Sequence, residues 1–464
     1  METNTAGEWL PPGRARGKTV QEQLDEEEVE VPWVLRQERY QFLGTQPLSR
    51  ERYYSRDWLA EEYEKVWKKT WQLACFEQDI PEVGDHVVYD IMDSSFIVVR
   101  TAPDEIKAYY NSCLHRGRQL RSTGGRVPQL RCPYHGIAWN LDGTLKEVPA
   151  PFAWDFPKID PGSFCLPEAR IETWDGLVFL NMDESAEPLS DFLGELVGHF
   201  ERWPFKNRWK SAHVAKVVPS NWKAAAEAFM ESYHVLATHP QTLAGGDGSN
   251  CEYDIYENFN RMILAPPIPN PNIPAEITEQ DVMDEVFYNR QWVTEEEHTG
   301  SAPVEVPMGM TARQVMAEAR RKQFSDEGID GADWTIMELA GTVQYWLFPN
   351  IFPWAGSIFY RFRPNGWDPD TAIMEVIMLM RWPEGKKRPP AAKVHWLTAD
   401  QDWTAAPELG DVTAVLNQDM ANLICVQRGV KNAKEGTGLT LANYEDNRIR
   451  HMHQCIDRWM GRES

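Results

Sequence analysis

Two short motifs in the chain each combine one cysteine with one histidine, and both residue types bind metal ions. Cys113-x-His115 and Cys132-x2-His135 lie within the segment CLHRGRQLRSTGGRVPQLRCPYHGIAW. The glycines of this segment favour tight turns. Each motif is therefore expected to form a loop that presents one thiolate and one imidazole, and the two loops together would supply four metal ligands.

Two kinds of metal site are compatible with this ligand set. Zinc is often held by two cysteines and two histidines, but in zinc fingers the cysteines and the histidines usually form separate pairs. Here each motif contributes one of each. That order favours a [2Fe–2S] cluster in which one iron takes two thiolates and the other takes two imidazoles. The motifs resemble the ligand loops of Rieske clusters, and zinc is the alternative.

A second pair of histidines lies in the Ala-rich segment EAFMESYHVLATHPQ, where His234 and His239 are five residues apart. On a continuous α-helix these side chains would point about 140° apart. Pro240 disfavours the helical conformation for His239, so we expect the helix to end there and the two imidazoles to converge. Two histidines and one carboxylate with open positions form the site of non-haem Fe(II) oxygenases. The alternative is a pair of ordinary histidines.

The best candidate for the carboxylate is Asp419, within DVTAVLNQDMANLICVQRG. It falls at helical spacing between Leu416 and Leu423, on the apolar stripe of the expected helix. A charge on that stripe is costly unless it is paired or bound to metal. Asp411, at the start of the same helix, is the weaker candidate, because a carboxylate is favoured at a helix N-terminus without any metal. A buried salt bridge is the alternative for Asp419.

Glu231 precedes His234 by three residues, so the two side chains would share a helical face. A carboxylate in this place can accept the spare N–H of a ligating imidazole and orient the ring. The alternative is a solvent-facing glutamate.

Composition limits the kinds of protein that carry these sites. The 464 residues are 42% hydrophobic and include seven cysteines, an odd and sparse set that is no disulfide framework. The net charge of −23 argues against a nucleic-acid partner. No apolar run is long enough to cross a bilayer, and the N-terminus lacks a secretory apolar stretch. We expect a cytoplasmic protein without a membrane partner.

The pattern of elements indicates an α+β protein in three parts. Residues 1–45 form an acidic arm, expected to be loosely ordered or, alternatively, packed on a neighbouring subunit. Residues 46–190 are β-rich with long loops, and residues 191–464 combine helices with an antiparallel sheet. Helices are expected at 56–71, 191–203, 221–238, 311–324 and 407–429, and strands over 83–100 and 339–382.

Taken in order, these features resemble the large (α) subunit of Rieske non-haem iron aromatic-ring-hydroxylating oxygenases. NWKAAAEAFMESYHVLATHP is similar to the mononuclear-iron helix of that family, and QDMANLICVQRGV is similar to its C-terminal ligand helix. The resemblance covers roughly residues 50–460. It implies an N-terminal all-β Rieske [2Fe–2S] domain at 46–190 and a C-terminal helix-grip α+β catalytic domain with an antiparallel sheet at 191–464.

The resemblance also implies the ligands of both metal groups. Cys113 and Cys132 would bind one iron of the cluster, and His115 and His135 the other. The mononuclear Fe(II) would be bound by the set His234, His239 and Asp419. The family is usually trimeric, α3 or α3β3, and electrons pass from the cluster of one subunit to the iron of its neighbour. Glu231 matches the acidic bridge between subunits, with His135 across the interface.

The activity implied is hydroxylation of an apolar, preferably aromatic, small molecule by mono- or dioxygenation with O2. Electrons would come from NAD(P)H through a separate ferredoxin or flavin reductase, because the chain has no G-x-G-x-x-G nucleotide motif. One alternative is a Rieske monooxygenase or demethylase that acts on a non-aromatic substrate such as a quaternary amine. Another is an electron carrier without an O2 site.

Two departures from the family bear on the substrate. Most relatives have Asp where this chain has Glu231, and Glu occurs in some members that act on quaternary amines. Many relatives have Asn where this chain has Ala228. The pocket beside the iron is expected to draw on an apolar and aromatic set: Phe229, Met230, Leu236, Tyr345, Trp346, Phe352, Trp354 and Phe359.

Overall fold

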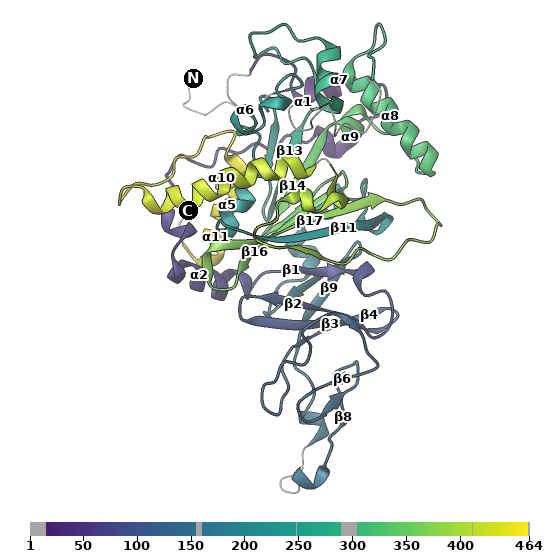
Figure 1. The fold of residues 1–464 in the computed structure, drawn as a ribbon, viewed down its shortest axis with the longest axis vertical. Helices are drawn as coiled ribbons and strands as arrows, with labels where there is room; N and C mark the ends of the chain where they lie inside the picture. Colours follow the sequence, from purple (N-terminus) through teal and green to yellow (C-terminus); the bar gives the residue numbers. More distant parts are fainter. Residues whose placement is uncertain (1–14, 155–159, 247, 289–303, 411, 463–464) are drawn as a thin grey trace.

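Two large β-sheets follow one another along the long axis of the molecule and carry the two candidate metal sites (Figure 1). The computed structural model describes residues 15–154, 160–246, 248–288, 304–410 and 412–462. The first sheet is built from strands between residues 72 and 181 and the second from strands between residues 208 and 397, and helices accompany both, so the α+β fold class predicted from the sequence is confirmed.

The first sheet has seven strands in the order β1-β10-β9-β4-β3-β2-β5 and is antiparallel throughout. A three-stranded sheet, β6-β7-β8, extends from its end. One cysteine–histidine motif follows β4, and the other lies between β6 and β7. The strands are β1 (Gln72–Phe76), β2 (Asp85–Ile91), β3 (Ser94–Ala102), β4 (Glu105–Tyr110), β5 (Gly125–Arg126), β6 (Leu130–Arg131), β7 (Ala138–Trp139), β8 (Leu145–Glu147), β9 (Glu168–Trp174) and β10 (Leu177–Asn181).

The second sheet has eight strands in the order β12-β13-β14-β15-β16-β17-β11-β18. Its centre, from β14 to β17, is the antiparallel meander predicted over 339–382. Only the pairing of β11 with the short edge strand β18 is parallel among the described residues. The strands are β11 (Arg208–Val218), β12 (Glu252–Ile255), β13 (Phe259–Leu264), β14 (Thr342–Leu347), β15 (Ile351–Pro353), β16 (Ile358–Asn365), β17 (Asp368–Arg381) and β18 (His395–Leu397).

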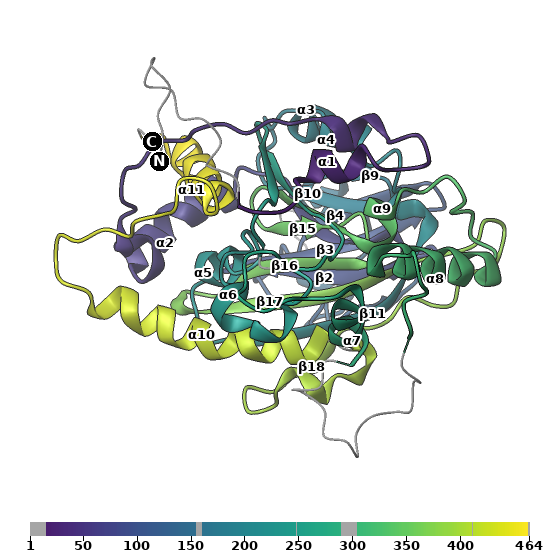
Figure 2. The ribbon, with the colours of Figure 1, turned by 90° about the horizontal axis from the view of Figure 1, so that it is seen from above.

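Helices on one face of this sheet position the histidine pair and the acidic candidate. Helix α5 (Trp222–Glu227) packs on β16 and β17, and the long helix α10 (Val412–Asn432) packs on α5. Figure 2 shows α10 running along this face with α5 and α6 (Val235–Thr238) between it and the sheet. Leu416, Asp419 and Leu423 are buried on one side of α10, as the apolar stripe predicts.

Some helices differ from their predicted extents. The helix expected over 191–203 is divided into α3 (Leu189–Leu193) and α4 (Leu196–His199), because Gly194 adopts a φ of 52° between them. The helix expected over 56–71 consists of α2 (Arg56–Glu62) followed by a π-helical turn. The remaining helices are α1 (Val20–Leu24), α7 (Glu279–Tyr288), α8 (Ala312–Glu327), α9 (Ile336–Ala340) and α11 (Asn447–Met460). In the described part of the chain, no helix is both long and apolar enough to cross a bilayer.

The acidic arm differs from the loose, solvated segment predicted for it. From residue 15 onward it packs on the second sheet of its own chain. The carboxylate of Glu27 accepts backbone N–H groups from Ile336 and Met337 at 2.8 and 3.0 Å, at the N-terminus of α9. A helix N-terminus favours negative charge, so part of the acidic composition of the arm serves to attach it.

A buried ionic network joins the two sheets within the chain. Arg361 and Arg363, on the face of β16 opposite the helices, both bind the carboxylate of Glu375, and each also donates to a backbone carbonyl of the first sheet region, those of Leu73 and Asp90. Burial alone would raise the pKa of Glu375, but the two guanidinium groups outweigh it and hold that pKa well below its usual range. The carboxylate therefore balances charge that is buried between the domains.

Glu375→Gln should destabilise the protein strongly, because it leaves two buried guanidinium groups without their negative partner. We expect the free energy of unfolding to fall by about 3–5 kcal/mol, measured by urea titration. Glu318→Gln, on the exposed surface of α8, is the matched control and should change it little. Equal stability of the two variants would contradict the role given to this network.

Candidate metal centres

The two cysteine–histidine motifs form a matched pair of turns at the end of the first sheet. The Cys113 carbonyl accepts the Gly117 N–H at 2.8 Å, and the Cys132 carbonyl accepts the Gly136 N–H at 3.0 Å. Both glycines have positive φ, 71° and 82°, a conformation that side chains with a Cβ rarely adopt. The loops predicted from the glycines are therefore present, and the cysteine at the start of each loop is buried.

The sulfur and nitrogen ligands of these loops separate into an inner and an outer pair. Both cysteines are buried, whereas His115 is partly exposed and His135 is exposed. The two imidazoles face each other with their Nδ1 atoms 3.2 Å apart. Burial raises the pKa of the Cys113 thiol, while backbone N–H groups of His115 and Arg116 act in the opposite direction. Such N–H groups stabilise a metal-bound thiolate.

The helix predicted over 221–238 is interrupted, and the interruption shapes the second site. Helix α5 ends at Glu227, and α6 begins only at Val235. His234 lies at the N-terminal boundary of α6, and His239, before Pro240, leaves the helical region with φ −124° and ψ 54°. The prediction that Pro240 ends the helix at His239 agrees with this geometry. The earlier break after Glu227 was not predicted.

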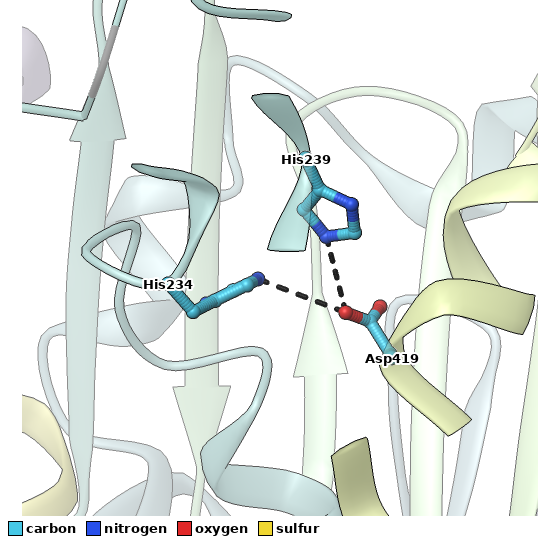
Figure 3. A group of neighbouring side chains, drawn as sticks. All are labelled: His234, His239 and Asp419. Carbon is cyan, nitrogen blue, oxygen red and sulfur yellow. Dashed lines mark hydrogen bonds and ion pairs between the residues drawn. The ribbon is translucent and has the colours of Figure 1, made fainter. Parts of the chain in front are cut away.

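These breaks bring His234, His239 and Asp419 together (Figure 3). The Oδ1 atom of Asp419 lies 3.1 Å from His239 Nε2 and 3.7 Å from His234 Nε2. One nitrogen from each ring and one carboxylate oxygen all lie within 4.8 Å of one another. Among the described residues, no other three histidine, cysteine or acidic side chains bring their ligand atoms close enough together to bind a single metal ion.

Glu231 holds His234 from the side away from Asp419. Its Oε1 lies 2.7 Å from His234 Nδ1, and its Oε2 accepts the backbone N–H of the same residue at 2.9 Å. The contact is made in a turn and not along the helical face that the sequence suggested. Burial lowers the pKa of His234, but the hydrogen bond and charge of Glu231 and the charge of Asp419 outweigh it, so the net pKa is raised.

Aromatic rings gather beside this group on the helix-facing side of β16. The Phe229 ring lies 4.7 Å from that of Tyr360 and 5.4 Å from that of Phe362. Trp354 contacts Tyr360, and Phe352 contacts Phe362. Burial raises the pKa of Tyr360, and the negative charge of Asp419 adds to this shift. These five residues, called the aromatic cluster below, form an apolar wall beside the site.

Only part of the pocket predicted from the sequence falls in this cluster. Phe229, Phe352 and Trp354 belong to it. Tyr345, Trp346 and Phe359 pack elsewhere in the core, Met230 is fully buried, and Leu236 is exposed. Tyr360 and Phe362 were missed. Side chains alternate along a strand, so a strand that contains Phe359 places Tyr360 and Phe362 on the opposite face, and this signal was available in the sequence. Gln418, which contacts the His239 imidazole, and Gln241, which contacts Gln418, were missed as well.

Two family models match the chain over these same regions. The Rieske [2Fe-2S] domain model matches residues 70–158, and the ring hydroxylating alpha subunit (catalytic domain) model matches residues 200–462. The chain belongs to the ring-hydroxylating alpha-subunit family. This confirms the family and the iron oxygenase class predicted from the sequence. The family carries a Rieske [2Fe–2S] cluster and a mononuclear iron, the two cofactors predicted from the ligand sets.

Relatives within the alpha-subunit family differ in what they oxidise. The chain is 32% identical to the alpha subunit of biphenyl 2,3-dioxygenase from Rhodococcus jostii over 184 residues, 38% of this chain and 40% of the relative. It is also 32% identical to the carnitine monooxygenase oxygenase subunit of Escherichia coli K12 over 182 residues, 39% and 48% of the two chains. These alignments span less than half the length of the curated relatives.

Solved structures of the alpha-subunit family share the fold over most of the chain. A quaternary ammonium Rieske monooxygenase in complex with L-carnitine has a TM-score of 0.61 at 16% identity, with 89% of this chain and 95% of that chain covered. Naphthalene 1,2-dioxygenase from Rhodococcus sp. bound to indole has a TM-score of 0.59 at 20% identity, with coverages of 90% and 94%.

The donor sets in this member of the family fit the two metal groups. Two buried thiols and two outward imidazoles match the mixed ligation of a Rieske cluster. Two imidazoles and one carboxylate whose ligand atoms lie within 4.8 Å of one another match the facial triad that binds non-haem Fe(II).

His234→Ala should remove the mononuclear iron and leave the cluster intact, because the two ligand sets lie at different ends of the fold. We expect the iron content to fall by about one third, while the visible absorbance of the cluster and the acid-labile sulfide stay unchanged. His395→Ala, on the edge strand β18, is the control and should keep all the iron. Loss of the cluster together with the third iron would contradict the separation of the sites.

Proposed function

We propose that this chain is the oxygenase component of a Rieske non-haem iron oxygenase. It would use O2 and electrons from NAD(P)H, delivered by a separate ferredoxin or flavin reductase, to hydroxylate an apolar small molecule, with aromatic compounds as the first class to test. The observation that carries this proposal is the approach of His234, His239 and Asp419 to within 4.8 Å of one another in a chain that also bears the cysteine–histidine loops.

The proposal assigns a role to each predicted site residue. Cys113 and Cys132 would hold one iron of the cluster, and His115 and His135 the other. The three residues of Figure 3 would hold the mononuclear iron. When bound, the cluster supplies single electrons and the mononuclear iron supplies open positions for O2. The protein binds the substrate, keeps water away and holds the imidazoles in their ligating orientation.

The shape of the molecule favours electron transfer between subunits. The loop of Cys132 and His135 joins β6 to β7 in the small sheet at one end of the long axis, whereas α6 and α10 lie in the other half (Figure 1). Leu114 and Tyr134 are exposed within the two cysteine–histidine loops, and Tyr233 and Leu236 are exposed beside the histidine pair. Two different apolar patches on one chain suit a head-to-tail contact that closes into a ring. A homotrimer, with or without a β subunit, satisfies this arrangement.

In such a trimer, Glu231 would connect the two redox groups. It already binds His234 Nδ1, and an exposed imidazole from a neighbouring copy, that of His135, is the partner implied by the family resemblance. Glu is longer than Asp by one methylene, so the link tolerates a wider spacing between subunits.

The aromatic cluster supports an apolar or aromatic substrate and also favours a second candidate. Rings such as Trp354 and Tyr360 attract cations through their π faces. Together with Glu at position 231 and the similarity to carnitine monooxygenase, they favour a quaternary amine as the second substrate class.

Product analysis separates the two classes of substrate. The purified chain, a surrogate ferredoxin and reductase, NADH and ¹⁸O2 should be incubated with a panel of aromatic hydrocarbons and a panel of quaternary amines. Label in an aromatic product supports the first class. Loss of an alkyl group from the amine, with release of the matching aldehyde as the fragment that receives the oxygen atom and no label in the aromatic panel, supports the second. NADH oxidation without labelled product from either panel would contradict both.

Glu231→Gln should keep both metal groups but slow turnover about 10–100-fold, because the amide retains a hydrogen bond to His234 and loses the charge that links the two sites. Steady-state turnover and the rate of cluster reduction by the surrogate donor measure the effect, and only turnover should fall. Glu201→Gln, an exposed residue, is the control. Unchanged turnover would reject the bridging role.

A further inference from the structure

The two histidines of the triad have orienting partners of different charge. The carboxylate of Glu231 binds Nδ1 of His234 at 2.7 Å, whereas the amide oxygen of Gln418 binds Nδ1 of His239 at 2.6 Å. Both rings therefore turn Nε2 toward Asp419. One imidazole is held by an anion and the other by a neutral group.

A second glutamine contacts the Gln418 amide. Gln241 Nε2 donates to the same Oε1 of Gln418 at 2.9 Å, and Gln418 Nε2 lies 3.5 Å from Gln241 Oε1. Gln241 is buried beside His239. The Oε1 atom of Gln418 thus faces both the Gln241 amide and the His239 imidazole, and an amide oxygen can only accept.

This orientation determines which nitrogen of His239 carries the proton. An acceptor at Nδ1 requires Nδ1–H, so the lone pair of a neutral ring is on Nε2, 3.1 Å from Asp419 Oδ1. That form can bind a metal ion, whereas the opposite tautomer would direct an N–H at the metal position. The neutral amide also preserves charge balance, because Asp419 and Glu231 together supply two negative charges for a divalent ion.

We propose that Gln418 and Gln241 form a positioning pair that holds His239 in its metal-binding tautomer and ties its loop to α10. Gln241 follows His239 by two residues, and Gln418 immediately precedes Asp419. Their contact therefore connects the segments of two ligands that are 180 residues apart in sequence. This inference rests on the proposed function, since it requires that the triad binds a metal ion.

The test measures metal binding and the imidazole proton directly. Gln418→Leu removes the acceptor, and we expect the affinity of the triad for Fe(II) to fall about 10–100-fold. In Co(II)-loaded protein, proton NMR should show an exchangeable, paramagnetically shifted N–H signal from each ligating imidazole. In Gln418→Leu one of the two should be lost to exchange with water, while the signal of the ring held by Glu231 stays. Gln418→Glu restores an acceptor and should restore the lost signal.

Asn422→Ala is the matched control. Asn422 lies one turn further along α10 and donates to Thr238 Oγ1 at 2.9 Å, so it joins the same two segments without contacting an imidazole. It should keep both signals and the Fe(II) affinity of the parent protein. Gln241→Leu should weaken binding less than Gln418→Leu, and the double variant should be no weaker than Gln418→Leu alone.

Two results would overturn the inference. One is that Gln418→Leu retains both N–H signals and full affinity, and the other is that Asn422→Ala loses as much affinity as Gln418→Leu. Failure of the parent protein to bind Co(II) or Fe(II) at the triad would instead overturn the proposed function on which the inference rests.

Discussion

The early end of α5 is the constraint on which the candidate catalytic centre depends. The segment from His234 to Thr238 is itself helical, so the break after Glu227 sets where both histidines lie relative to α10, and the non-helical conformation of His239 lets the two imidazoles converge. The turn between the helices is held from outside: the Ser232 hydroxyl lies 3.2 Å from the Gly248 carbonyl and 3.1 Å from the Tyr253 hydroxyl. A Cβ at Gly248 would meet Ser232 at less than 3 Å. The interruption is therefore stabilised by the strand and loop that follow it.

Two buried carboxylates, those of Asp419 and Glu375, each need a positively charged partner. Asp419 is buried on the apolar side of α10, and neutral imidazoles that turn Nε2 toward it do not balance its charge. A divalent ion would complete the balance, since an uncompensated buried carboxylate is costly. Between the sheets, Glu375 meets this requirement with arginines. The charge at the first site would be balanced by a bound ion, whereas the charge at the second is balanced by protein groups alone.

Sequence patterns predicted much of this arrangement, and the parts they missed have a common cause. The glycines beside Cys113 and Cys132 and the proline after His239 act on their own neighbours, so their effects are visible locally. The apolar stripe that marks Asp419 is also a local pattern. The break after Glu227 opposes a strong local preference of alanine for the helix and is stabilised by Gly248 and Tyr253. The contact between Gln418 and Gln241 joins residues 177 positions apart, and no spacing rule reveals such a pair.

The most direct test of the account is a crystal structure of the purified protein with anomalous diffraction recorded on both sides of the iron and zinc absorption edges. We expect anomalous scattering from iron in two separate places: a two-iron feature between the loops of Cys113 and Cys132, and a single peak among His234, His239 and Asp419. Zinc at the cysteine–histidine loops, or no metal among the three residues of the triad when iron is supplied, would contradict it.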